Sequence, residues 1–64
     1  EMASGMAHEL TQPLTALLAG AQAGRRLLNR NNTEALAGAL EDMVDQARRA
    51  SAILDRLRNW SRPQ

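Results

Sequence analysis

Apolar and small residues recur along the chain at alternating spacings of four and three positions, in two stretches separated by a short polar segment. This heptad pattern is typical of α-helices that pack against other helices, and no strand pattern fits it as well. It predicts one domain, residues 1–64, with helices at about 2–29 and 34–61. The two seams consist of Ala3, Ala7, Leu10, Leu14, Leu17, Ala21, Gly24 and Leu28, followed by Leu36, Leu40, Met43, Ala47, Ala50, Leu54 and Leu57.

The polar segment between the two stretches predicts a turn at about residues 30–33. Asn31, Asn32 and Thr33 are each able to cap the N-terminus of the second helix, and Glu34 falls in its first turn. A connection this short makes the two helices antiparallel neighbours. The expected unit is therefore an all-α, antiparallel two-helix hairpin.

The apolar stripe on each predicted helix is wider than a single contact with one neighbour requires, which suits a four-helix bundle. A chain of 64 residues is marginally stable alone, and without cysteine it has no disulfide to stabilise it. We therefore expect the hairpin to dimerise into a four-helix bundle. Leu17 and Leu54, both on the seams, should be buried in that bundle.

Charge and composition exclude several classes of partner. The net charge is +1, from eight arginines against seven acidic residues, and no basic run exceeds two residues, so nucleic acid is not expected. The longest uncharged stretch, from Leu10 to Gly24, includes polar residues and is too short to span a bilayer. Direct membrane contact is not expected either, since acids are interleaved and Trp60 is the only bulky anchor. Because the helical pattern runs nearly to both ends and the first residue is Glu1, we expect a fragment of a longer protein.

His8 is the only histidine, and it falls just off the first seam, on the predicted outer surface. A lone histidine on a helix is usually a surface residue without a role. A zinc site of the His-Glu-x-x-His type would need a second histidine at position 12, where the chain has Gln12. With no other His and no Cys, no metal site is expected.

Pro13 lies within the first predicted helix, where proline removes an amide donor at a cost of about 3 kcal/mol. One interpretation is that the helix begins near Gln12, with Pro13 at its first position. However, Ala7 and Leu10 keep their heptad phase with Leu14 across the proline. A continuous, kinked helix fits that pattern better.

The stretch from His8 to Thr15 resembles the H-box of bacterial sensor histidine kinases, in which histidine is followed by an acid, an apolar residue, two polar residues, proline and leucine. Residues 1–10 and 48–58 are similar to a proteobacterial branch that includes PAS-linked kinases such as the oxygen sensors of nitrogen-fixing bacteria. The H-box of that branch often has asparagine where this chain has Thr11. The resemblance covers essentially the whole chain and implies a dimerisation and histidine-phosphotransfer domain.

The resemblance implies roles for three residues. His8 would take the γ-phosphoryl group of ATP on a ring nitrogen and pass it to an aspartate of a response regulator. Glu9 would accept the proton from the other ring nitrogen. Gln12, one turn after His8, stands where related kinases have Thr or Asn that helps position water for dephosphorylating the regulator. Gln12 departs from that pair, although its amide can also orient a water.

The resemblance also implies partners beyond the second copy of the chain. ATP and Mg²⁺ would be bound by a separate ATP-binding domain of the parent kinase, and this fragment, which holds no cofactor, would not be active alone. The segment of the parent kinase that contains this domain would lie in the cytoplasm. A response-regulator receiver domain should dock below His8, along the small residues Ala16, Ala19, Gly20 and Ala23 and part of the second helix. The alternative is a purely structural homodimeric bundle without chemistry.

Overall fold

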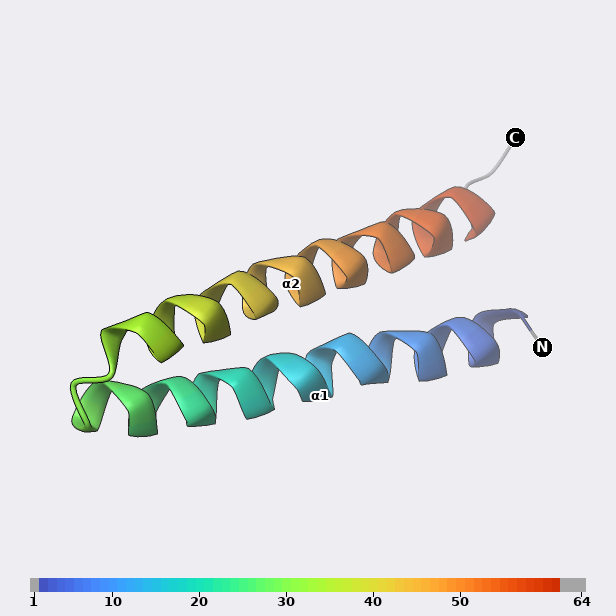
Figure 1. The fold of residues 1–64 in the computed structure, drawn as a ribbon. Coiled ribbons are helices and arrows are strands. Elements are labelled where there is room, and N and C mark those ends of the chain that lie inside the picture. Colours follow the sequence, from blue (N-terminus) through green and yellow to red (C-terminus); the bar gives the residue numbers. More distant parts are fainter. Residues whose placement is uncertain (1, 62–64) are drawn as a thin grey trace.

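The computed structural model describes residues 2–61, except for the side chains at 2–4, 6, 60 and 61, so Ala3 and Trp60 lie outside the described side chains. Two helices, α1 (Met2–Asn29) and α2 (Thr33–Ser61), run antiparallel and side by side in a molecule of 52 × 17 × 11 Å (Figure 1). The described range contains no strand. The expected all-α helical hairpin is therefore confirmed, while its dimerisation lies beyond a single chain.

Asparagine side chains and backbone form the turn between the helices. Asn31 has a φ of 57°, the left-handed conformation that asparagine tolerates better than most residues. The amides of Asn31 and Asn32 donate to the carbonyls of Leu28 and Leu27, at 3.0 and 2.9 Å, and so close the C-terminus of α1. The Asn32 side chain then accepts a hydrogen bond from the amide of Ala35 at 3.2 Å. Of the three candidate caps Asn32 is the one used, and α2 begins one residue earlier than expected.

Helix α1 continues without a break through Pro13, so the interpretation that it begins near Gln12 is wrong. The proline ring is completely buried, in the face of α1 that packs on α2. The hydroxyl of Thr11 donates to the carbonyl of Ala7 at 3.0 Å, one turn back. Burial of the ring explains how the helix retains a residue that costs it a backbone hydrogen bond.

Only a narrow strip of each helix is covered in the hairpin. Among the described side chains, Ala50 and Ile53 on α2 are buried together with Pro13 on α1. Small residues let the backbones approach, because a Cβ at Gly20 would lie 2.8 Å from Cγ of Met43. The covered strip consists of Leu10, Pro13, Leu17, Gly20, Ala23, Gly24 and Leu27 on α1, with Leu36, Ala39, Met43, Gln46, Ala50, Ile53 and Leu57 on α2.

The seams read from the sequence divide into two surfaces in the structure. Leu10, Leu17 and Gly24 face α2, whereas other seam residues point away from the neighbouring helix. Leu17 is half-buried, but Leu54 is 49% exposed in the hairpin. We call the uncovered set the apolar flank; its members, all between 49 and 60% exposed, are Leu14, Leu18, Leu28, Leu40, Val44 and Leu54.

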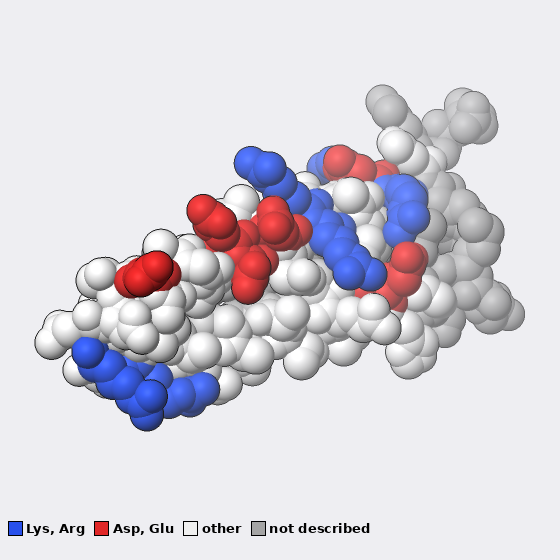
Figure 2. Space-filling view, viewed as in Figure 1, with Lys and Arg blue, Asp and Glu red and all other residues white. Residues whose placement is uncertain are grey.

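Charged side chains are distributed unevenly along the hairpin. On the face seen in Figure 2, a cluster of basic side chains lies at the turn end, and acidic and basic side chains are interspersed along the rest of the hairpin. The arginines near the turn include Arg25 and Arg26 at the end of α1, where they complement the negative end of the helix dipole. Neither described helix has a stretch long and apolar enough to cross a membrane.

Candidate functional site

His8 is exposed on α1, on the side of the helix that faces away from α2. Successive residues of an α-helix are roughly 100° apart, so His8 lies roughly 180° around the helix from Leu17, which packs on α2. Gln12 follows one turn later and is also exposed. His8 is thus open to large partners approaching from outside the hairpin.

Glu9 is held by a residue of the other helix. Its Oε1 accepts a hydrogen bond from Nη2 of Arg56 on α2 at 3.0 Å, with both side chains about half exposed (51% and 55%). The expectation for Glu9 concerned only its neighbour His8. Sequence reasoning missed Arg56, because pairing it with Glu9 requires the register of the two helices, and no local motif reveals that register.

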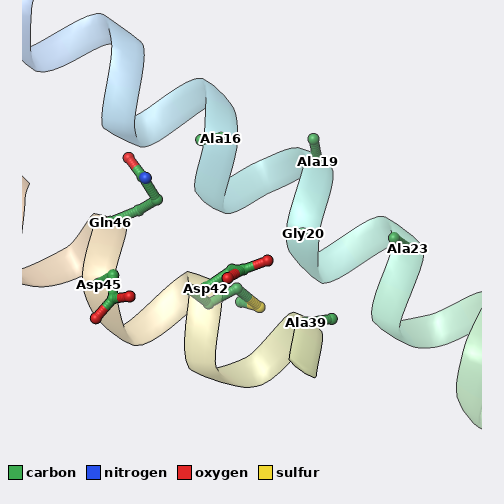
Figure 3. A pocket seen from close by; sticks show the side chains of 9 residues that line it. Ala16, Ala19, Gly20, Ala23, Ala39, Asp42, Asp45 and Gln46 are labelled. Atoms are coloured by element: carbon green, nitrogen blue, oxygen red, sulfur yellow. The ribbon is translucent and has the colours of Figure 1, made fainter. Parts of the chain in front are cut away.

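A groove of about 420 Å³ runs along the hairpin on the same side as His8. Small residues of α1 form its floor. Ala19 and Ala23 come eleven and fifteen positions after His8, spacings that place them near the same side of the helix as His8. Figure 3 shows these small residues of α1 opposite polar side chains of α2, with Gln46 extending toward α1. The lining comprises Ala16, Ala19, Gly20, Ala23, Ala39, Asp42, Met43, Asp45 and Gln46. The four small α1 residues expected at a docking surface are thus brought together, and the α2 side adds two aspartates that sequence reasoning did not assign to it.

A second groove, of about 360 Å³, lies on the apolar flank. Leu28 from α1 and Leu40 from α2 line it together, with Ala21, Gly24 and Leu36 between them. The hairpin therefore has two chemically distinct long faces. One is apolar, and the other carries His8 and the acid-rimmed groove of small residues.

Comparison with known protein families distinguishes a histidine-phosphotransfer domain from a purely structural bundle. The whole chain, residues 1–64, matches the family described as the His Kinase A (phospho-acceptor) domain. The chain belongs to this family. It is accordingly a phospho-acceptor domain of the sensor histidine kinases, which act in two-component signalling.

Curated relatives of this phospho-acceptor domain are sensor kinases. It is 44% identical over 63 residues to the sensor protein FixL of Bradyrhizobium diazoefficiens, covering 94% of this chain and 12% of that protein. It is 44% identical over 61 residues to the tetrathionate sensor histidine kinase TtrS of Salmonella typhimurium, covering 94% and 10%. It is 36% identical over 62 residues to the C4-dicarboxylate transport sensor protein DctB of Rhizobium meliloti, covering 97% and 10%. No solved structure matches the chain significantly.

The chain spans about a tenth of the length of these relatives. Within the phospho-acceptor domain, the structure places His8 and Gln12 on one face and turns Glu9 toward α2, as its bond to Arg56 requires. Among the side chains described, no three His, Cys, Asp or Glu residues come together in a way that could hold a metal ion. This face presents the imidazole of His8 and the amide of Gln12, and the carboxylate of Glu9 lies next to them at the edge of the strip that packs on α2.

Proposed function

We propose that His8 is the residue of this domain that carries the phosphoryl group. The observation that supports it most is its exposure on the face that continues into the groove of small residues, because two partners must reach the same ring nitrogen in turn. In the first step a ring nitrogen attacks the γ-phosphorus of ATP, a nitrogen–phosphorus bond forms, and the bond to the leaving ADP oxygen breaks. In the second step the phosphoryl group moves to an aspartate of a receiver domain.

Glu9 accepts the proton that the imidazole loses from its other ring nitrogen. A carboxylate next to the acceptor in the chain is close enough for this after a rotation of its side chain. Gln12, one turn further and exposed, is placed to orient a water near the phosphorylated regulator. His8, Glu9 and Gln12 thus have separate roles as nucleophile, base and water ligand.

The groove of small residues is the docking surface for the receiver domain. Its α1 floor offers little side-chain bulk, so a helix of the partner can approach closely. Asp42 and Asp45 line its α2 side and favour a partner with basic residues beside its apolar contact. The groove lies on the His8 face, which brings a docked aspartate toward the imidazole.

The apolar flank pairs with a second copy of the chain to form a four-helix bundle. Six large apolar side chains at 49–60% exposure on one flank are more than an isolated hairpin of this size keeps in water. The strip that joins α1 to α2 separates the apolar flank from the groove of small residues on the His8 face. A dimer formed through the apolar flank therefore leaves both copies of His8, and the groove of small residues in each copy, open.

The activity of the whole protein follows from these parts. The chain belongs to a cytoplasmic portion of a protein-histidine kinase, in which a separate domain binds ATP with Mg²⁺ and phosphorylates His8. No nucleic acid or membrane takes part in this step.

The experiment that tests the acceptor compares the intact kinase with its His8→Gln variant after incubation with γ-labelled ATP. Acid-labile, base-stable label should appear on the former and be absent from the latter, while circular dichroism shows the same helix content in both. Glu9→Gln should bind ATP normally and label more slowly, since size is kept and the base is lost. Undiminished label on folded His8→Gln protein, as another acceptor would give, contradicts the proposal. An intact, folded kinase that takes no label, as a purely structural bundle would, contradicts it as well.

A further inference from the structure

The Glu9–Arg56 pair joins the two helices next to the proposed acceptor. Of the ion pairs among the residues that the structure describes, it is the one that links α1 to α2, since Asp55 and Arg58 pair within α2. The 3.0 Å contact lies toward the open end of the hairpin, since Glu9 comes 20 positions before Asn29 and Arg56 comes 23 positions after Thr33. Any relative movement of α1 and α2 at this level changes the distance between the carboxylate and the guanidinium.

The pair draws the carboxylate away from the imidazole it is proposed to serve. Glu9 lies roughly 80° around α1 from Leu17, at the edge of the strip that packs on α2, whereas His8 lies roughly 180° from it. Arg56 contacts the carboxylate from the α2 side. The bonded conformation of Glu9 is therefore directed toward α2, and an approach to the ring of His8 requires the side chain to rotate away from Arg56.

The loss of charge on Glu9 during the reaction also makes the ion pair unfavourable for phosphorylation of His8. Glu9 is an anion before the transfer and becomes a neutral acid when it takes the imidazole proton. Its attraction to Arg56 is therefore stronger before the reaction than in the transition state. An interaction that weakens on the way to the transition state slows the chemical step.

We propose, on the basis of the function proposed above, that Arg56 is a positioning residue that restrains Glu9. While the ion pair is closed, the carboxylate is turned to α2 and His8 lacks its base. When α2 shifts relative to α1, the pair opens and Glu9 becomes available to the imidazole. The ion pair thus makes the rate of His8 phosphorylation depend on the relative position of the two helices.

The test measures the initial rate of His8 labelling in the intact kinase carrying Arg56→Gln. Because exposed ion pairs are weak, the expected effect is a rise of roughly two- to five-fold, with the KM for ATP unchanged. Arg56→Lys keeps the charge and should restore most of the slower rate. Arg48→Gln is the matched control, because Arg48 is exposed on α2, on the side away from α1, and should leave the rate as it is. A rate that is unchanged or lower in Arg56→Gln overturns the proposal, as does an equal rise in Arg48→Gln.

A double substitution shows whether Arg56 acts through Glu9. In a Glu9→Gln background, Arg56→Gln should cause no further change in the residual rate, whereas a purely structural role of Arg56 would persist there. The ratio of the Arg56→Gln rate to the wild-type rate should also fall toward one as salt is raised, since salt screens the exposed pair. A full effect of Arg56→Gln in the Glu9→Gln background overturns the proposal. The His8→Gln protein is measured alongside. Label remaining on it would contradict the proposal that His8 is the acceptor, whereas the Arg56 variants test only whether Arg56 restrains Glu9.

Discussion

Gly20 of α1 faces the side chain of Met43 of α2 so closely that a Cβ on the glycine would lie 2.8 Å from the methionine Cγ. The methionine atom involved is near the backbone, so it cannot move aside as freely as the end of the side chain. Gly20→Ala should therefore separate the helices or displace Met43. The cost of overpacking, about 1–3 kcal/mol, exceeds the gain of about 1 kcal/mol from replacing glycine in a helix. Thermal denaturation should show a lower Tm.

Gly38 provides the matched control for this prediction. It lies in α2 and has no atom within 4 Å of the position of an added Cβ. Gly38→Ala should gain helix stability without a clash and raise the free energy of unfolding by about 0.5–1 kcal/mol. If both variants melt above the wild type, the close approach at Gly20 does not limit the packing.

Two neighbouring residues of α1 distinguish the two faces of the hairpin. Leu18 belongs to the apolar flank, and Ala19 lines the groove on the His8 face. Leu18→Asp should disrupt the proposed dimer, because a carboxylate buried without a partner is costly. Ala19→Asp adds the same charge where it should leave the dimer intact and reduce transfer to the receiver domain. Light scattering at micromolar concentration and the rate of transfer from phosphorylated His8 measure the two effects, and exchanged outcomes would reverse the assignment of the faces.

Pro13→Ala changes the free energy of unfolding through two opposing contributions. Replacing a proline in the helix interior gains about 3 kcal/mol relative to alanine, while loss of two ring methylenes from a buried site costs about 1.6 kcal/mol, or somewhat more if a cavity remains. The net expectation is a rise in stability of about 1 kcal/mol, read as a higher Tm. A fall in Tm would mean that packing of the fully buried ring outweighs the lost hydrogen bond.

The cap of α2 allows a test of the turn. Asn32→Ala removes the acceptor of the Ala35 amide and should lower the free energy of unfolding by about 1 kcal/mol. Thr33→Ala, one residue later and exposed, should change it by less than half as much. Urea denaturation of the two variants gives the comparison, and equal losses would assign the cap to both residues.

The sequence predicted the helices and the turn because these depend on local signals, namely heptad spacing, the asparagines and the absence of strand patterns. It did not predict which seam residues meet. Leu10, Leu14 and Leu17 share one heptad pattern, yet Leu14 is half exposed in the hairpin while the other two pack on α2. A stripe that contacts two neighbours looks the same as one wide seam until the helix axes are placed.

The residues of the candidate site likewise fall into those that local sequence predicts and one that depends on how the helices are placed. His8, Glu9 and Gln12 could be named from a contiguous motif, and the small residues of α1 from their spacing. Arg56 could not, because it is 47 positions from Glu9 and meets it only through the register that the turn fixes. One residue more within α2, before Arg56, would rotate Arg56 by roughly 100° about the helix axis and carry it away from Glu9.

The covalent connection at residues 30–32 joins the two helices at one end only, so a change in the angle between them is a tilt about the turn. His8 lies about 32 Å along α1 from Asn29, at 1.5 Å per residue. Each degree of tilt between the helices about the turn therefore moves the His8 level of α1 by about 0.6 Å relative to α2. A tilt of only a few degrees, too small to disturb packing near the turn, is enough to change contacts at the open end by more than an ångström.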